Sequence, residues 1–518
     1  RELRRLTDRA APFPREVAQR VLREEWGSAA SGARAAAAAA CAVAVPDLPA
    51  AAASLCQVYR VRLKGWGVVA VKVQRPDIRG RVCADLYLLR HAARAADGLL
   101  GTGGGARAAA DEYGRRLVDE LDFRREARAA SAFAADAARL GLPATCAAVA
   151  PVTQLTTRRV LVSPWAQGES LGAVAARDPA EARRLQSVAV GAFMAMLLET
   201  GRLHADPHAG NLLRAPDGRL LILDWGLVAP VPAATRRRLR AYVVHVLSGD
   251  FEAVPSDLAA LGFVAAGKEG ALRDAEVAQA IAGAFRRLAS GGGARQRVED
   301  VFPALAAVRQ RHGNVGQVPA SFVYILRTFG ILEGLGLSLD PGYRIVDDCL
   351  PYVASWLTRA REDEAVPAFR GLLYGANAHR RHPVPDAAQV VALASGLAAA
   401  LQPLPGAPGG AALPELLRRV LEATPLCDAL LWEVARAADV LAREALEAVV
   451  GPRAAQQAGL ARTPEDRAVV ASARRLAGLL ATALPRREAE ELLERALAAA
   501  LGGGGGAAAA ALLGAGRP

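Results

Sequence analysis

The sequence predicts an α+β fold of two lobes, a small N-terminal lobe with a β-sheet and a helical C-terminal lobe, followed by an α-helical C-terminal region. Residues 57–63 alternate apolar and polar side chains, and a second, mainly apolar strand pattern at 68–73 follows a glycine-containing turn, which predicts a β-hairpin. Beyond residue 228 the apolar spacing is helical, with short loops. The 518 residues are enough for two or more domains, each with its own core.

We expect five segments along the chain. They are an N-terminal helical extension at 1–40, the N-lobe at 41–165, the C-lobe at 166–375, a helical region at 376–501 and a low-complexity tail at 502–518. Within them we predict one long helix at 106–140, a strand near 157–165, and helices at 234–247, 277–289, 301–311, 322–335, 413–450 and 465–501, with a Pro/Gly-rich linker at 401–410.

Composition argues against several classes of protein. The formal net charge is +12, but the arginines are scattered along helical stretches, so we interpret them as solvated faces and expect no nucleic-acid partner. The six cysteines include no C-x-x-C pair, which favours a reducing compartment over a zinc site or a disulfide framework. We find no strongly apolar run of about eighteen residues or more, so no membrane span is expected.

Lysine occurs at only three positions, 64, 72 and 268, so a lysine inside an apolar strand is notable. Strand alternation places Lys72 on the face of Val68 and Ala70, opposite the valines at 69, 71 and 73. A strand lysine usually reaches solvent. The string V-A-V-K, however, matches the strand motif whose lysine binds nucleotide phosphates.

The stretch from Gly201 to Val228 carries the strongest functional signal. Asp206 and Asn211 stand five apart in a loop rich in Pro, His and Gly, and Asp224 ends the apolar run LLILDWG. This is the catalytic-loop and metal-loop layout of a protein kinase, in which the first aspartate orients or deprotonates the attacking hydroxyl and the other two residues hold Mg²⁺. Either motif alone is common, and the ordered pair is far more specific.

His204 and His208 flank Asp206 and have two interpretations. They pack and hydrogen-bond within the loop, or they belong to a transition-metal site. No cysteine accompanies them, and only His245 follows within the next hundred residues, so packing is favoured.

The segment PAAAAS at 49–54 lies where an ordinary kinase has its glycine-rich phosphate loop. Alanine side chains are small enough for backbone to approach a phosphate, but they disfavour the positive φ angles that glycine allows. We therefore expect a stiffer loop with a tendency to start a helix.

Taken in order, PAAAASLCQVYRVRL, VAVKVQRP, DELDFRREA, LHADPHAGN and LLILDWGLV resemble the UbiB family of atypical kinase-like proteins, also called ABC-one kinases, over about residues 1–375. The resemblance implies a protein-kinase-like fold with ATP and Mg²⁺ as cofactors. It further implies catalytic roles for Asp206, Lys72 and Glu126, metal ligation by Asn211 and Asp224, and nucleotide contacts from Ala51, Ala52, Ala53, Ser54, Lys72 and the E-x-D pair Glu120 and Asp122.

The chain departs from the family pattern in a few places. D-F-G is replaced by Asp224-Trp225-Gly226, which keeps an aromatic plug, and Pro164 stands where the hinge is commonly acidic. The K-x-G-Q motif is absent, and we expect it, with any targeting peptide, to lie upstream of Arg1 in a longer precursor. Without that lysine, Glu120 and Asp122 are expected to lack a cation partner.

The leading functional hypothesis is a Mg·ATP-dependent atypical kinase or ATPase that supports isoprenoid quinone or other lipid metabolism in a plastid. A bacterial or mitochondrial location is the alternative, and the expected partners are ATP, a lipid or quinone-pathway ligand or a protein, and a membrane surface in peripheral contact. The second hypothesis is a nucleotide-binding scaffold without turnover. A small-molecule kinase of the aminoglycoside or choline type shares H-x-D-x-x-x-x-N but does not explain PAAAAS together with VAVKVQRP.

Overall fold

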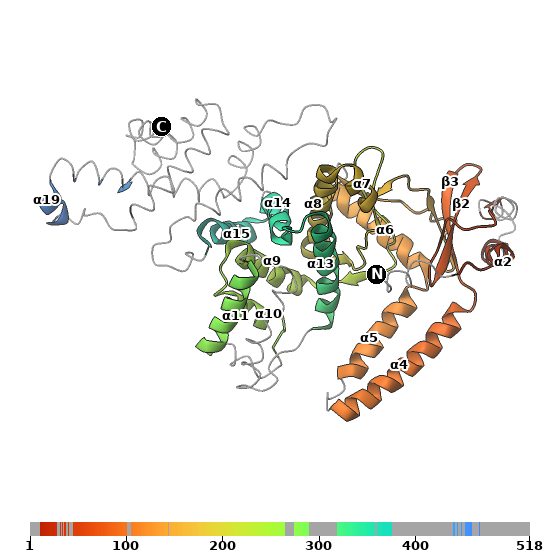
Figure 1. Cartoon of the computed structure of the whole chain (residues 1–518), viewed down its shortest axis with the longest axis horizontal. Helices are drawn as coiled ribbons and strands as arrows, with labels where there is room; N and C mark the ends of the chain where they lie inside the picture. The colour runs from red at the N-terminus through yellow and green to blue at the C-terminus, as the bar shows by residue number, and fades with distance from the viewer. Residues whose placement is uncertain are drawn as a thin grey trace. The chain divides into compact units, whose positions relative to one another are not determined.

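The computed structural model describes residues 11–27, 45–100, 105–142, 145–264, 274–289, 319–357, 360–375 and 451–457, together with single residues at 32, 34, 36, 37, 40, 439, 440, 443, 447 and 466 (Figure 1). The chain divides into two compact units. The first comprises residues 1–231 and 320–343, and the second comprises 232–319 and 344–518. The lobe boundary expected at residue 165 lies inside the first unit and stays a prediction.

The N-terminal sheet of the first unit has the strand order β1-β2-β3-β5, with β1 at Ala51–Ala52, β2 at Cys56–Leu63, β3 at Gly67–Gln74 and β5 at Val160–Pro164. All neighbours are antiparallel, and Lys72 pairs with Val58 and Leu161. The predicted hairpin and the third strand are confirmed. The expected helix start in the alanine loop is wrong, because Ala51 and Ala52 instead pair with β2 as a short strand.

The two faces of this sheet are covered by different helices. The valines at 69, 71 and 73 are completely buried, in one core with α2 (Arg15–Trp26). Trp26 anchors α2 by donating from Nε1 to the Leu155 carbonyl at 2.8 Å. On the face of Lys72, Phe123 and Ala127 of α6 pack with Cys56 and Leu161. Side-chain alternation along β3 thus directs its lysine toward α6.

Three helices connect β3 to the rest of the first unit: α4 (Ile78–Leu100), α5 (Gly105–Asp119) and α6 (Phe123–Arg139). α4 and α5 lie side by side (Figure 1). The single helix predicted at 106–140 is wrong, because the chain turns between α5 and α6. Asp122 is the N-cap of α6, and its side chain accepts from the Arg124 amide at 3.1 Å.

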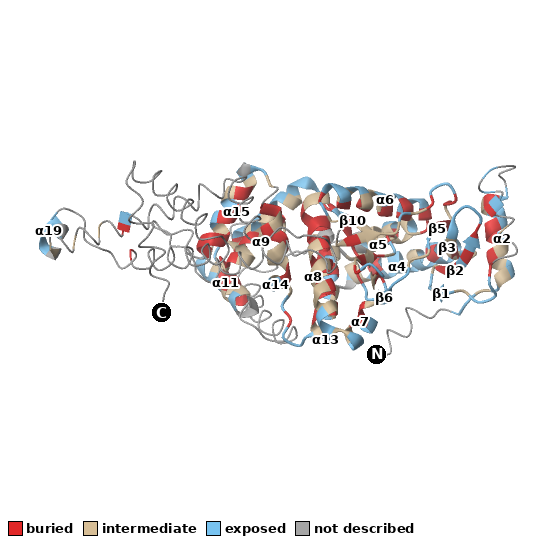
Figure 2. Cartoon of the chain, turned by 90° about the horizontal axis from the view of Figure 1, so that it is seen from above, coloured by how far each residue is buried: buried red, intermediate tan, exposed pale blue. Residues whose placement is uncertain are grey.

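A second sheet follows, with the strand order β4-β9-β8-β6: β4 at Cys146–Ala148, β9 at Leu220–Ile222, β8 at Leu212–Arg214 and β6 at Glu169–Ser170. A separate pair joins β7 (Arg202–His204) to β10 (Val228–Pro230). α7 (Leu171–Arg177), α8 (Pro179–Ala195) and the π-helical turn η1 (Met196–Thr200) precede these strands, and buried residues run along α8 (Figure 2).

α13 (Ala320–Leu339) returns to the first unit and packs against α8. The Gln186 amide of α8 donates to the Leu332 carbonyl at 2.8 Å. By length and composition, residues 322–339 would suffice to cross a membrane, so the expectation of no such run is wrong. α13 contacts α8, and 28% of residues 322–339 are buried.

In the second unit the described helices are α9 (Ala233–Ser248), α10 (Val254–Ala260), α11 (Ala275–Ala289), α14 (Ile345–Leu357), α15 (Glu362–Tyr374) and α19 (Pro452–Gln457). The helices predicted at 234–247 and 277–289 are confirmed. The helix expected at 301–311, the linker at 401–410 and the tail at 502–518 lie outside the described residues.

Candidate active site

Lys72 lies at the centre of a cluster drawn from separate parts of the first unit. Its ammonium donates to both carboxylate oxygens of Glu126, at 3.1 and 3.0 Å, and to Oδ1 of Asp224 at 3.0 Å. β3 carries Lys72, the first turn of α6 carries Glu126, and Asp224 follows β9. Only 15% of the lysine side chain is exposed, so Lys72 is not a strand lysine that reaches into solvent.

These three charges shift one another's pKa values. Burial alone would lower the pKa of Lys72, but Asp224 and Glu126 outweigh it and raise that pKa well above its usual value. Burial raises the pKa of Glu126 to about 7, against the opposing charge of Lys72. For Asp224, burial is outweighed by Lys72, and the pKa falls to about 2. At neutral pH the cluster therefore holds an ammonium beside an ionised Asp224.

The backbone at Asp224 has a positive φ of 54°, a conformation that non-glycine residues seldom adopt. Two residues later, a Cβ on Gly226 would come within 3.3 Å of Asp224 Oδ1 and 3.8 Å of Glu126 Oε2. The intervening Trp225 is buried, donates to the Ile222 carbonyl at 3.1 Å and stacks on Phe133. The aromatic plug is therefore present and holds the turn that presents Asp224.

Asn211 lies beside this turn. Its side-chain Nδ2 donates to the Asp206 backbone carbonyl at 3.0 Å, and its backbone carbonyl accepts from the Leu223 amide at 2.9 Å. The second bond joins the D-x-x-x-x-N loop to the residue that precedes Asp224. Because the amide nitrogen is engaged, Oδ1 is the atom that Asn211 can offer to a metal.

His204 supports the loop from beneath. It is completely buried, with Nε2 3.0 Å from the Leu223 carbonyl and Nδ1 accepting from the Asp206 amide at 3.2 Å. Its ring contacts Phe193 and Trp225 edge-on, and burial lowers its pKa, so the imidazole is neutral at pH 7. The packing interpretation is confirmed for this residue.

The E-x-D pair is divided between two environments. Burial raises the pKa of Glu120 to about 7, and the charges of Asp224 and Asp206 add to the rise, so Glu120 lies within electrostatic reach of the cluster. Asp122 instead binds the guanidinium of Arg124, with both donor–acceptor distances 2.8 Å. The expectation that the pair lacks a cation partner is wrong for Asp122, because its N-cap position directs it toward the first turn of its own helix.

The alanine loop is held by backbone bonds and one arginine. The Ala53 amide donates to the Cys56 carbonyl at 2.9 Å, and Arg75 Nε donates to the Ala53 carbonyl at 3.0 Å. Ser54 follows, exposed to solvent. Arg75 belongs to the string VAVKVQRP, but nothing in the sequence indicates its contact with the loop 22 residues earlier.

Arg327 of α13 is a site residue that the sequence analysis missed. Its Nη2 donates to Asp206 Oδ1 at 2.8 Å across 121 residues of sequence. Arg327 lies in an apolar helix far from the motifs, so periodicity predicts its helix but not its partner.

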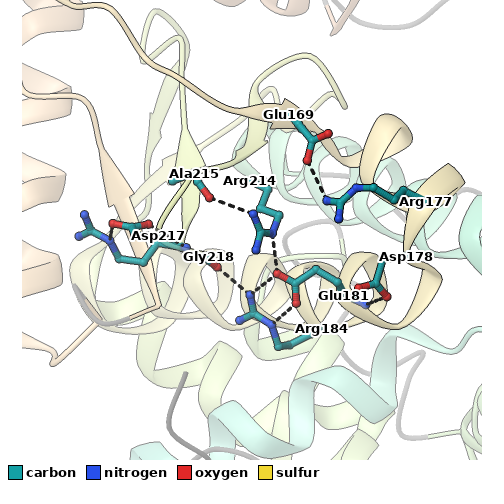
Figure 3. A network of polar contacts seen from close by, with 10 residues as sticks. Glu169, Arg177, Asp178, Glu181, Arg184, Arg214, Ala215, Asp217 and Gly218 are labelled. Atoms are coloured by element: carbon teal, nitrogen blue, oxygen red, sulfur yellow. Dashed lines mark hydrogen bonds and ion pairs between the residues drawn. The ribbon is translucent and has the colours of Figure 1, made fainter. Parts of the chain in front are cut away.

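An ion-pair network supports the two strands that lie between Asn211 and Asp224 (Figure 3). Glu181 of α8 accepts from Arg184 Nε at 2.7 Å and from Arg214 Nε of β8 at 2.8 Å. Arg184 also donates to the Gly218 carbonyl, in the turn between β8 and β9, at 2.7 Å. Hydrogen bonds from Arg184 and Arg214 lower the pKa of Glu181 to about 2. β8 starts directly after Asn211 and β9 ends just before Asp224, so the network fixes both site residues indirectly.

Comparison with known protein families identifies the domain. Residues 5–258 match the ABC1 atypical kinase-like domain. The chain carries an ABC1 atypical kinase-like domain. The match confirms the resemblance to the UbiB, or ABC-one, family and the kinase-like α+β fold.

Relatives of the ABC1 domain occur in cyanobacteria and plants. Protein sll0005 of Synechocystis is 31% identical over 382 residues, which cover 72% of this chain and 53% of the relative. The aarF domain-containing protein kinase At1g71810, chloroplastic, of Arabidopsis thaliana is 30% identical, with coverages of 72% and 51%. The chloroplastic protein ACTIVITY OF BC1 COMPLEX KINASE 3 of the same plant is 32% identical, with coverages of 60% and 43%. The chain thus spans about half the length of the curated relatives it matches.

Proposed function

We propose that the chain binds Mg·ATP and transfers the terminal phosphoryl group to a hydroxyl acceptor or to water. The observation that carries the proposal is the position of Lys72, bonded to Glu126 and Asp224 at 3.0–3.1 Å. A lysine held between a helical glutamate and a D-x-G aspartate is the arrangement that grips nucleotide phosphates in protein kinases.

Each residue of the site has a role that follows from its contacts. Glu126 is buried and holds the Lys72 side chain in one conformation, so that its ammonium is already positioned to bind phosphate oxygens. Asp206 is held by Arg327 and by its own backbone bonds, and its carboxylate would orient the attacking oxygen. In the reaction a P–O bond forms between the acceptor oxygen and the terminal phosphorus. The bond between that phosphorus and the bridging oxygen of ADP breaks, and the acceptor proton leaves by way of Asp206 or solvent.

The donor set suits Mg²⁺. Asp224 offers an ionised carboxylate, and Asn211 offers an amide oxygen from a backbone bonded to the residue before Asp224. Hard oxygen ligands from one or two side chains, completed by phosphate oxygens, are what Mg²⁺ normally takes in nucleotide sites. When bound, the ion would neutralise phosphate charge. Asp224 and Asn211 therefore fit a Mg²⁺ ion.

The experiment that tests turnover is the Asp206→Asn variant. The change keeps the shape of the side chain but removes its charge, so Mg·ADP affinity should stay within a few-fold of wild type while the ATP hydrolysis rate falls by about a hundredfold or more. Both quantities are measured on purified full chain, with and without lipid vesicles. Wild type that binds nucleotide but hydrolyses none under any of these conditions would favour the scaffold hypothesis.

We further propose a role in isoprenoid quinone or other lipid metabolism in a plastid. The relatives named as chloroplastic and their cyanobacterial counterparts support the plastid location, and the resemblance to the UbiB family is the ground for the quinone or lipid role. A peripheral membrane contact and a lipid or quinone-pathway ligand belong to the same proposal. Turnover that rises when vesicles or quinone head-group analogues are added would support it, and turnover that is indifferent to both would count against it.

A further inference from the structure

Phosphoryl transfer places negative charge where the acceptor approaches, and the D-x-x-x-x-N loop brings no cation of its own to that position. The loop reads DPHAGN, without Lys or Arg, and Lys72, bonded to Glu126 and Asp224, is assigned to the phosphates of the nucleotide and not to the acceptor side. An arginine supplied from elsewhere in the same chain is one known solution to this problem.

Arg327 is placed to be that arginine. Its Nη2 lies 2.8 Å from Oδ1 of Asp206, the residue assigned to the acceptor side of the reaction, and its charge also acts on Glu120. Bonding to Asp206 uses only part of a guanidinium that carries five N–H donors, and 49% of the Arg327 side chain is exposed. The remaining donors can therefore reach a ligand oxygen.

The position of Arg327 is fixed by its helix. The next residue, Thr328, is completely buried, and its hydroxyl is 3.4 Å from the His204 carbonyl. Leu332 is held by Gln186 at 2.8 Å, and Arg116 stacks over the ring of Tyr324 at 4.8 Å. Two adjoining residues thus attach α13, one to Asp206 of the loop and one to His204 at the end of β7, and both contacts hold the guanidinium beside Asp206.

We propose that Arg327 is a further catalytic residue. Its guanidinium contacts the phosphoryl group during the transfer, while Asp206 orients the acceptor. Arg327 changes neither the bonds that form and break nor the path of the proton. It neutralises charge on the oxygens of the transferring group. This assignment rests on the proposed function, because it presupposes that a phosphoryl group passes through the site.

The test compares binding of Mg·ADP with binding of Mg·ADP plus fluoroaluminate, a mimic of the transferring phosphoryl group. Wild type should bind the mimic complex on the order of a hundredfold more tightly than Mg·ADP alone, since transition-state mimics gain at least that much. Arg327→Gln should lose most of this gain while keeping its Mg·ADP affinity within about twofold, because only the phosphoryl group is contacted. Arg327→Lys should recover part of the gain in affinity, because lysine keeps the positive charge but lacks the planar set of N–H donors of a guanidinium.

Arg177→Gln is the matched control. Arg177 forms an ion pair with Glu169 at 2.9 Å in the same unit, of similar exposure but apart from the residues of the site, and its loss should leave the gain unchanged. Guanidinium ion should restore ATP turnover to Arg327→Ala, an effect that a purely structural role would not produce.

The outcomes separate the two proposals. Wild type that does not bind Mg·ADP overturns the proposed function and this inference with it. If wild type binds Mg·ADP, then an undiminished fluoroaluminate gain in Arg327→Gln, or no gain in wild type, overturns the inference alone. An Arg327→Gln variant that hydrolyses ATP faster than wild type also overturns it, because the ion pair would then be an inhibitory latch.

Discussion

At the residue scale, the main feature is a single ammonium shared by two carboxylates of unequal proton affinity. Burial is the largest cause that raises the pKa of each carboxylate, and Lys72 lowers both; the balance leaves Glu126 with a pKa of about 7 and Asp224 with a pKa of about 2. The Glu126 side chain is 8% exposed and that of Asp224 is 47% exposed. The more exposed carboxylate is also the one assigned to the metal, which lets an ion approach without displacing Glu126.

The Glu181 network predicts a loss of stability in acid. The folded-state pKa is about 2, below the usual 4.5, so the stabilising contribution is present above pH 4.5 and disappears as the pH falls toward 2. Glu181→Gln should reduce the free energy of unfolding at pH 7 by about 2 kcal/mol, and the difference from wild type should shrink as the pH falls below 4.5. Urea unfolding at several pH values measures this.

Glu169→Gln is the control for that experiment. Glu169 also binds an arginine, but its side chain is 49% exposed against 14% for Glu181, and solvent-exposed pairs add little stability. An equal effect of the two substitutions, or a Glu181 effect that does not depend on pH, would contradict the assignment.

At the element scale, α13 shows how one helix can hold tight and open positions together. Gly336 lies against the buried Tyr343 ring, and a Cβ there would overlap the ring atoms. Gly330, on the same helix, has nothing within 4 Å of the position a Cβ would take. The helical pattern of the sequence predicts the helix but does not distinguish the two glycines. Gly336 is necessary only because the ring of Tyr343 packs against it.

Alanine at these two glycines should have opposite effects. Gly336→Ala should destabilise the first unit by about 1–3 kcal/mol, because a buried aromatic ring must move. Gly330→Ala should stabilise it by up to about 1 kcal/mol, because alanine favours helix more than glycine does. Thermal unfolding of both variants tests the pair, and a neutral Gly336→Ala would show that Tyr343 does not pack as described.

Sequence patterns predicted local structure well where a period of two or a motif was present. Alternation along β3 placed Lys72 on the correct face, and the apolar run before Asp224 gave β9. The break between α5 and α6 was missed because Glu120, Leu121 and Asp122 fit a helical pattern, and only the N-cap bond to Arg124 shows that the helix restarts. The Arg327 contact was missed because side chains 121 residues apart are joined by packing, not by periodicity.

At the scale of the whole molecule, the assigned residues lie in one of the two compact units. Residues 1–231 contribute β3, α6, the loop at 206–211 and the turn at 224–226. The segment 320–343, which includes α13, completes the same unit. The sequence predicted the order of the motifs, and the lobe boundary predicted at residue 165 falls directly after β5, the last strand of the N-terminal sheet. Nucleotide bound at the site would stabilise this unit directly.

The measurement that tests the central claim most directly is the shift in melting temperature caused by Mg·ADP. At a hundredfold excess over Kd, a ligand of the native state adds about 2.7 kcal/mol to the free energy of unfolding, which should raise the melting temperature of wild type by several degrees. Asp224→Asn should lose most of that shift, because it removes the ionised metal ligand bonded to Lys72. Asp217→Asn, an exposed turn residue paired with Arg219, should keep it in full. No shift in well-folded wild type, or an equal shift in Asp224→Asn, would contradict the assignment of this site to Mg·nucleotide.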